Sequence, residues 1–172
     1  MILVADSGST KTDWVLIDNK KITTSFHTRG FNPYFTTAEK LHADLLQELP
    51  NELIPINITQ VVFYGSGCSL PEMKNLIHLG LKKIFSQSEI EIEHDLLGAA
   101  RALFKDATGI ALILGTGANT CLYNGKEIVK NIPSLGFILG DEGGGDYLGK
   151  LFITELLYNN LPKDISSEFH HK

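Results

Sequence analysis

The sequence predicts an α/β fold made of one complete unit and the start of a second, similar unit. Three observations support this prediction. Short apolar runs alternate with amphipathic helical segments as far as residue 106, the strand pattern restarts at residue 110, and each copy turns on a small-glycine-small sequence after its first strand. Strands that alternate with helices in this way are typical of a sheet covered by helices.

The composition limits the classes of function. A chain of 172 residues that is 43% hydrophobic and 20% charged can bury the core of an ordinary globular domain. The net charge of -5 comes from interleaved acidic and basic residues, which excludes a basic face for nucleic acid or an anionic membrane. Cys68 and Cys121 are too few for a disulfide framework or a structural zinc site. A reducing cytoplasm suits two such cysteines, and Asp6 interrupts the apolar start well short of a signal peptide or a membrane span, so we expect a soluble, unprocessed, cytoplasmic protein.

The first copy opens with short strands that are expected at residues 2–6, 12–18 and 22–28. A helix is expected at 36–49, where Thr36 and Glu39 have the spacing of a capping box. Its apolar face is formed by Leu41, Leu45, Leu46 and Leu49.

Strands and helices then alternate. The pattern predicts a strand at 60–65, a helix at 69–85, a strand at 90–94 and a helix at 95–104. Ser69 is the expected N-cap of the second helix, with Glu72 as its capping-box partner. The order of elements to residue 106 is therefore β-β-β-α-β-α-β-α.

The second copy repeats strand, glycine turn, strand, Asn-Gly turn and strand from residue 110. A glycine-rich loop at 140–145 and one helix at 146–161 follow. We therefore expect a first lobe at residues 1–108 and the beginning of a second lobe at residues 109–172. The second copy stops where the first still has two strand-helix units to go, so we expect the chain to be a fragment.

The first glycine turn, "SGST" at residues 7–10, follows a strand that ends on Asp6. Backbone N–H groups in such a turn point into a shared concavity that suits a phosphate, although an ordinary hairpin turn has the same composition. A carboxylate at the end of a buried strand suits magnesium, or it caps the turn. The second turn, "GTGAN" at 115–119, offers another such concavity, and neither turn has the pattern of a P-loop or a dinucleotide fold.

Further polar residues have a structural and a functional interpretation. Asp95 opens a helix, where it either caps the helix or acts as a general base toward a substrate hydroxyl. The loop "GDEGGGDY" at 140–147 either accepts hydrogen bonds from a sugar or is a flexible acidic helix start. Asn32 precedes Pro33 and is a turn residue unless other observations give it a ligand.

Four stretches, "DSGSTKTD", "HDLLGAA", "LGTGAN" and "GDEGGGDYLGK", resemble in order and separation the N-acetylglucosamine kinases and the wider BadF/BadG/BcrA/BcrD-type ATPase family. This family belongs to the sugar kinase, actin and heat-shock chaperone superfamily. The resemblance implies the ribonuclease H-like, actin-like ATPase fold, with two similar lobes and with ATP and magnesium in the cleft between them.

The resemblance also implies a role for each matching residue. Asp95 matches the carboxylate that acts on the sugar hydroxyl, and Asp6 matches the residue that organises Mg²⁺. The implied ATP and phosphate contacts are Ser7, Gly8, Ser9, Thr10, Gly115, Thr116, Gly117 and Asn119. The implied sugar contacts are Asn32, Leu135, Gly136 and Asp141.

The implied reaction is ATP-dependent phosphorylation of the 6-hydroxyl of an amino sugar, in a protein that could form a homodimer. Ser7 and Ser9 stand where many such kinases have glycine, and Leu135 stands where they often have an aromatic residue. The adenine-binding part of such a kinase lies beyond residue 172, so we expect weak activity from this chain alone. Two other functions fit the motifs: an ATPase that activates a reductase or dehydratase, and a non-catalytic sugar or nucleotide sensor.

Overall fold

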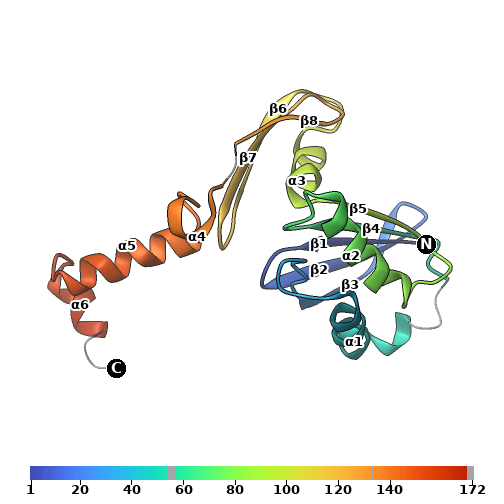
Figure 1. The fold of residues 1–172 in the computed structure, drawn as a ribbon, viewed down its shortest axis with the longest axis horizontal. Coiled ribbons are helices and arrows are strands. Elements are labelled where there is room, and N and C mark those ends of the chain that lie inside the picture. The colour runs from blue at the N-terminus through green and yellow to red at the C-terminus, as the bar shows by residue number, and fades with distance from the viewer. Residues whose placement is uncertain (54–56, 133, 170–172) are drawn as a thin grey trace.

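The computed structural model describes residues 1–53, 57–132 and 134–169, and within these ranges the strands form two sheets (Figure 1). The first sheet has the order β3-β2-β1-β4-β5 and the second has the order β6-β7-β8. The strands of the first sheet are β1 (Ile2–Ser7), β2 (Lys11–Asp18), β3 (Lys21–Arg29), β4 (Gln60–Gly65) and β5 (Glu89–His94). Those of the second are β6 (Gly109–Leu114), β7 (Ala118–Tyr123) and β8 (Ile128–Ile132).

The helices follow the expected order with additions. They are α1 (Ala38–Glu48), η1 (Asn51–Leu53, one turn of 3-10 helix), α2 (Pro71–Lys82), α3 (Asp95–Phe104), α4 (Gly136–Leu139), α5 (Gly145–Leu157) and α6 (Lys163–Phe169). Figure 1 shows α3 between the two sheets, while α4, α5 and α6 extend away from them. No helix in the described part of the chain is both long and apolar enough to cross a membrane.

The first sheet combines antiparallel and parallel pairing. β1 pairs antiparallel with β2 and parallel with β4, and β4 pairs parallel with β5. Side chains alternate between the two faces of a strand, so Leu3 and Ala5 point to the same side and are fully buried. They belong to one apolar cluster with Leu41 and Leu45 of α1 and with Ile77 of α2. The two helices therefore cover one face of this sheet.

A second, smaller cluster joins the two halves of the chain. Leu96 and Ala100 of α3 pack with Ala111, Cys121 and Tyr123 of the second sheet, and all of these residues are buried. Small side chains at two of these positions allow a close approach of helix and sheet. The second sheet is therefore held to the rest of the molecule through α3.

The opposite face of the second sheet is uncovered within the described residues. Ser7 and Leu114 are the last paired residues before their respective turns, so β1 and β6 hold equivalent positions in the repeat. Leu3, Ala5 and Ser7 are fully buried, whereas 61% of Ile110, 55% of Leu112 and 64% of Leu114 is exposed. The repeat thus preserves the pleat of the strand but not the helices that cover it.

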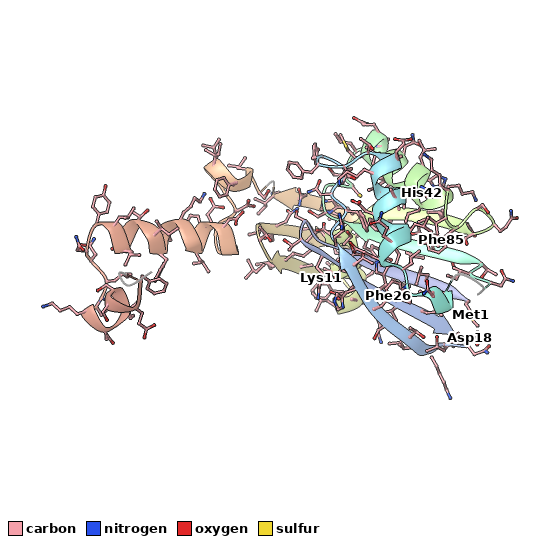
Figure 2. The ribbon with its side chains drawn as sticks, turned by 90° about the horizontal axis from the view of Figure 1, so that it is seen from below. Met1, Lys11, Asp18, Phe26, His42 and Phe85 are labelled. Carbon is pink, nitrogen blue, oxygen red and sulfur yellow. The ribbon has the colours of Figure 1, made fainter. Side chains whose placement is uncertain are left out.

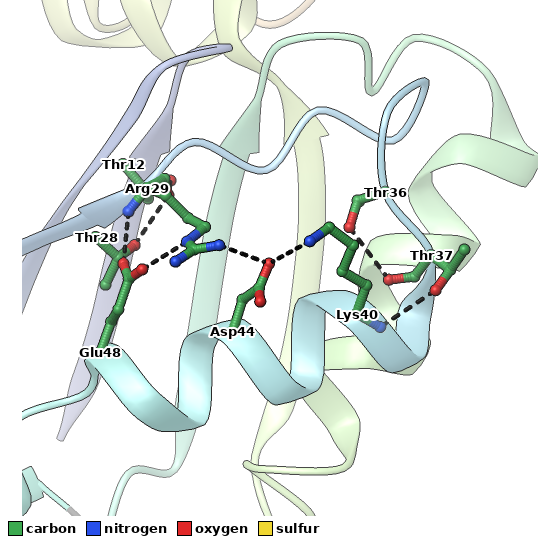
Figure 3. A network of polar contacts seen from close by, with 8 residues as sticks. All are labelled: Thr12, Thr28, Arg29, Thr36, Thr37, Lys40, Asp44 and Glu48. Atoms are coloured by element: carbon green, nitrogen blue, oxygen red, sulfur yellow. Dashed lines mark hydrogen bonds and ion pairs between the residues drawn. The ribbon is translucent and has the colours of Figure 1, made fainter.

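An ion-pair network attaches α1 to the end of β3 (Figure 3). The Arg29 guanidinium lies 2.5 Å from an oxygen of Glu48 and 3.1 Å from an oxygen of Asp44. Lys40 also reaches Asp44, at 3.2 Å. Because Arg29 and Lys40 share Asp44, the network fixes the direction of α1 relative to the sheet, although its exposed members limit its contribution to stability.

Several local expectations were wrong. The N-cap of α1 is Thr37, whose hydroxyl accepts from Lys40 N at 3.2 Å, so the helix begins one residue later than a Thr36 cap requires. α2 begins at Pro71 after Leu70 and has no side-chain cap, because proline at the first helical position needs no acceptor for an N–H group. Leu46 is 49% exposed and does not share the buried face of α1.

The C-terminal elements also differ from expectation. α4 and α6 were not predicted, and α5 ends at Leu157 instead of continuing to residue 161. Asn159 has a positive φ of 57°, a conformation that does not continue a right-handed helix. The expected strands and the helix at 95–104 are otherwise reproduced within one or two residues.

A chain of hydrogen bonds closes the base of the first turn inside the core. Phe31 N donates to Ser7 Oγ at 3.0 Å, Ser7 Oγ lies 2.7 Å from Thr12 Oγ1, and Thr12 Oγ1 donates to the carbonyl of Arg29 at 2.9 Å. Since Thr12 uses its proton on Arg29, the proton between the two hydroxyls belongs to Ser7. Each of these buried groups is thereby satisfied.

We expect Ser7→Ala to lower the free energy of unfolding by about 1–3 kcal/mol, because it leaves the buried Phe31 N–H without an acceptor and removes the donor to the Thr12 hydroxyl. Urea denaturation measures the change. Ser9→Ala is the matched control, and its exposed hydroxyl should change stability by no more than about 0.5 kcal/mol. Equal effects of the two substitutions would contradict the assignment.

Candidate functional site

The first turn projects from the end of β1 and β2 with free backbone donors. Gly8 N donates to the carbonyl of Lys11 at 2.9 Å, which leaves Ser9 and Thr10 at the tip. In the described part of the chain neither Ser9 N–H nor Thr10 N–H has a hydrogen-bond acceptor. The turn lies directly on Gly30, where a Cβ would come within 2.3 Å of the Gly8 carbonyl oxygen. Two unpaired N–H groups on an exposed, supported turn can bind an anion.

Asp6 precedes this turn, and its carboxyl faces other acids. It pairs across the strands with Asp13, whose carboxylate is 2.9 Å from Lys11. Partial desolvation, followed by the charges of Asp95 and Asp13, raises the pKa of Asp6 above its ordinary value, and Lys11 partly offsets this effect. A second cation beside Asp6 would relieve the repulsion, so the position fits a metal ion that also binds phosphate oxygens.

Asp95 is the first residue of α3 and follows β5. Its Oδ1 accepts from Leu96 N at 2.8 Å, and only 17% of its side chain is exposed. Burial raises the pKa of Asp95, while His94 and the hydrogen bond from Leu96 N oppose the shift. β1, β4 and β5 run parallel, so Asp6 and Asp95 meet at the carboxyl edge of one sheet, where ligands of such sheets bind.

Asn32 connects the first turn with the loop that follows β3. Its amide Nδ2 donates to Ser9 Oγ at 3.3 Å, and its Oδ1 accepts from Tyr34 N at 3.0 Å. Gly67, in the turn after β4, packs against the same side chain, because a Cβ there would lie 2.8 Å from Asn32 Oδ1. Asn32 is therefore both a turn residue and a neighbour of the first turn.

The second turn has a similar tip and is held from behind by the start of α5. Gly115 N donates to the carbonyl of Gly117 at 2.9 Å. Gly145 N donates to the carbonyl of Gly115 at 2.8 Å, and Asp146 N donates to that of Thr116 at 3.0 Å. These bonds use the carbonyl groups of the turn, and within the described residues the N–H groups of Thr116 and Gly117 have no acceptor.

Asp141 clamps the glycine-rich loop to the second turn. Its backbone has a φ of 60°, its side chain is buried, and its Oδ1 accepts from Ala118 N at 3.1 Å. A Cβ on Gly117 would lie 2.7 Å from this oxygen, and one on Gly144 would lie 2.7 Å from the Gly117 carbonyl carbon. Both glycines are therefore required by the close approach of two backbone segments.

The remaining predicted residues lie around this clamp. Asn119 Oδ1 accepts from Asn131 Nδ2 at 2.8 Å, which links β7 to β8. Leu135 is exposed and has a φ of 55°, Gly136 has a φ of 71°, and the bond from Asp141 N to the carbonyl of Ser134 closes the loop around them. Leu135 and Gly136 are thus adjacent to Asp141.

The structure brings the predicted residues together in two groups. One contains Asp6, the first turn, Asn32 and Asp95, and the other contains the second turn, Asn119, Leu135, Gly136 and Asp141. Figure 2 shows Lys11, beside the first turn, at the end of the first sheet nearest the second sheet, with Met1 and Asp18 at the opposite end. No group of three His, Cys, Asp or Glu side chains with metal-binding geometry occurs among the described residues.

The glycines that support the two turns lie outside the residues predicted from the sequence. Gly30 and Gly144 carry no ligand-binding group, yet each is positioned directly under a predicted phosphate turn. Gly30 stands just before the segment that contains Asn32, and Gly144 stands in a run of three glycines. Glycine beside a predicted site residue is therefore the signal in the sequence that points to them.

We expect Gly144→Ala to detach the loop from the second turn, because its Cβ would meet backbone atoms that cannot rotate away. Hydrogen exchange of the Gly145 and Asp146 amides should accelerate about tenfold or more, as for the loss of about one or two hydrogen bonds. Gly145→Ala is the control, since its Cβ would lie 3.4 Å from the nearest atom, an ordinary contact. Unchanged exchange in Gly144→Ala would argue against the clamp.

We expect Asp95→Asn to lower the pKa of Asp6, because it removes a neighbouring negative charge and keeps the acceptor for Leu96 N. Both folded-state pKa values are raised, so the native state binds more protons than the unfolded state and loses stability as pH rises through them. Asp95→Asn should therefore stabilise the protein more at pH 7 than at pH 3.

Carbon-13 NMR titration of the Asp6 carboxyl and urea denaturation at the two pH values measure these effects. Asp106→Asn, at an exposed aspartate, serves as the control. An unchanged pKa of Asp6 in Asp95→Asn would show that the two carboxyl groups do not interact.

The fold and the site can be compared with known structures. A "Putative N-acetylglucosamine Kinase" from Porphyromonas gingivalis is 43% identical, with a TM-score of 0.90, over 98% of this chain and 60% of that chain. Another protein of that description, from Chromobacterium violaceum, is 20% identical, with a TM-score of 0.60, over 91% of this chain and 56% of that chain. The ethanolamine utilization protein EutJ from Carboxydothermus hydrogenoformans is 12% identical, with a TM-score of 0.57, over 99% and 61% of the respective chains.

No protein-family model and no curated protein matches the chain. The chain spans about three fifths of the length of the Porphyromonas protein. The two more distant likenesses show the fold alone, while the first extends to sequence over almost the whole chain. The chain therefore has the actin-like ATPase fold of the sugar kinase, actin and heat-shock chaperone superfamily, and within that superfamily it resembles the N-acetylglucosamine kinases.

Proposed function

We propose that the chain contributes the phosphate-binding turns and the general base of a cytoplasmic, ATP-dependent kinase that phosphorylates the 6-hydroxyl of an amino sugar. The observation that carries this proposal is the pair Asp6 and Asp95 at one sheet edge. Both residues stand at the carboxyl ends of strands in one parallel arrangement, beside a turn with free N–H groups, and the charge of Asp95 raises the pKa of Asp6. Phosphoryl transfer needs this combination of a metal-binding acid, a base and phosphate donors.

The two turns would bind the polyphosphate of ATP. Ser9 and Thr10 N–H would contact it from one side, and Thr116 and Gly117 N–H from the other, with the Thr10 and Thr116 hydroxyls as further donors. The buried Ser7 hydroxyl supports the first turn, so Ser7 would act through its position in that support. Asp6 would hold Mg²⁺, which when bound neutralises charge on the phosphate oxygens.

Asp95 would take the proton of the sugar hydroxyl as that oxygen attacks the terminal phosphorus of ATP. The bond from this phosphorus to the bridging oxygen breaks, ADP leaves with the electron pair, and a sugar phosphate forms while Asp95 holds the proton. A largely buried carboxylate suits this role, because burial raises the pKa of Asp95 and so makes it a stronger base.

The sugar would lie between Asn32 and the loop that contains Leu135, Gly136 and Asp141. Asp141 Oδ1 is used by Ala118 N, so Oδ2 would be its acceptor for a sugar hydroxyl. Exposed Leu135 would present an apolar wall to the ring. The contact of Asn32 with Ser9 would place the sugar next to the phosphate turn.

The positions of the cysteines favour the kinase over an activator of a reductase. An iron–sulfur cluster needs thiolates that can reach it, whereas Cys68 and Cys121 are both buried and belong to separate apolar clusters. Burial also raises the pKa of Cys68 to about 12. A non-catalytic sensor would bind sugar or nucleotide without turnover, so an assay of ADP release distinguishes it from the kinase.

The test is ADP release in the presence of ATP, Mg²⁺ and a panel of amino and neutral hexoses, with the 172-residue chain and with any longer in-frame product of its gene. We expect N-acetylglucosamine or a related amino sugar to stimulate release. Asp95→Asn should lower kcat by about 10²–10⁴ with little change in the KM for sugar, because it removes the base and not a binding group. Asp106→Asn should behave like the unsubstituted protein.

Sugar binding by calorimetry without turnover would favour the sensor. Equal turnover in Asp95→Asn would remove Asp95 as the base, and the absence of sugar-stimulated release from both proteins would reject the kinase.

A further inference from the structure

His94, the last residue of β5, was not assigned a role from the sequence, yet it lies against the proposed base. Its Nδ1 is 3.2 Å from Asp95 Oδ1 and 3.3 Å from Leu96 N, whose N–H points at Nδ1 as well as at Oδ1 in a helix cap. Leu96 N is itself 2.8 Å from Asp95 Oδ1. The three atoms form a closed triangle at the start of α3, and the His94 side chain is only 20% exposed.

The position of one proton decides whether this triangle is favourable. If Nδ1 lacks a proton, Leu96 N–H is shared between two acceptors, and the lone pairs of Nδ1 and of the ionised Oδ1 face each other. If Nδ1 carries a proton, it donates to Oδ1, and Leu96 N–H donates to the same oxygen over the shorter distance. An ionised Asp95 therefore favours a proton on Nδ1, in either the neutral or the charged imidazole.

We propose that His94 is the positioning residue of Asp95: its Nδ1–H binds Oδ1, keeps the carboxyl group ionised in a largely buried place, and leaves Oδ2 as the free acceptor. The base function of Asp95 rests on the proposed kinase activity, but the contact does not. With Oδ1 occupied by two donors, Oδ2 is the carboxylate oxygen that remains to take the proton of a substrate hydroxyl. The charge of His94 opposes the effect of burial on the pKa of Asp95, as this contact requires.

The other groups around Asp95 are an acid, a buried thiol and a lysine that is paired with a neighbouring acid. Asp6 faces it from β1, and repulsion between the two carboxylates raises the pKa of Asp6. Cys68, after β4, also senses the charge of Asp95 and remains a thiol because burial raises its pKa to about 12. Lys74 of α2 is engaged by Glu93, at 2.5 Å. His94 is thus the donor side chain in direct contact with Asp95 among the described residues.

Two substitutions separate this role from helix capping. His94→Ser keeps an N-cap hydroxyl but is too short to replace the imidazole, whereas His94→Asn keeps a cap and an N–H close to the position of Nδ1. The pKa of Asp95 is measured by carbon-13 NMR on the 172-residue chain, with the amide spectrum as the check that each variant folds.

We expect the pKa of Asp95 to rise by about one unit in His94→Ser, as for the loss of one charge-assisted hydrogen bond, and to stay close to the unsubstituted value in His94→Asn. An unchanged pKa in His94→Ser, or an equal rise in both variants, would overturn the proposal. Nitrogen-15 shifts of His94 in the unsubstituted chain need no variant, and an unprotonated Nδ1 beside ionised Asp95 would overturn it as well.

In an active form of the proposed kinase, His94→Ser should move the acidic limb of the pH profile of kcat to higher pH in step with the pKa of Asp95, with little change in the KM for sugar. A merely structural role would lower the amount of folded enzyme without moving this limb. If the protein shows no kinase activity, the proposed function fails while the NMR result still decides the contact.

Discussion

The packing of α3 against both sheets is the interaction on which the rest of the structure depends. Leu96 and Ala100 are buried between α3 and the second sheet. On the other side, Gly98 approaches Tyr64 of β4 so closely that a Cβ would lie 2.7 Å from the ring. Because Asp95 is the first residue of this helix, the same packing that joins the two halves of the chain also sets where the carboxylate lies.

The supports of the two turns are chemically different although the turns look alike in sequence. The first turn rests on buried hydroxyl groups, because Ser7 and Thr12 bond to each other and to the backbone after β3. The second rests on backbone carbonyl groups that accept from the start of α5, and on Asp141. The N-acetylglucosamine kinases often have glycine at the position of Ser7. Here the hydrogen bonds of the Ser7 hydroxyl to Thr12 and to Phe31 N explain the serine.

The sequence predicted the strands well because the turns between them are marked by glycine and asparagine and because apolar residues alternate with a period of two. It predicted helix starts less well, since Thr36 and Thr37 are chemically equivalent candidates and only the backbone conformation selects Thr37. The roles of Asp6 and Asp95 came from the family resemblance, whereas their place at one sheet edge depends on the parallel pairing of β1, β4 and β5. The contact of His94 with Asp95 could not be foreseen, because it depends on the rotation of two adjacent side chains.

The hydrogen bonds that Gly145 N and Asp146 N donate to the second turn attach the start of α5 to that turn. α5 has 13 residues, so it is roughly 20 Å long, and the turn holds it at one end. If the turn rotated by about 10° and α5 moved with it as a rigid helix, the far end of α5 would move by roughly 3 Å. The direction of α5 is therefore set by the geometry of the second turn.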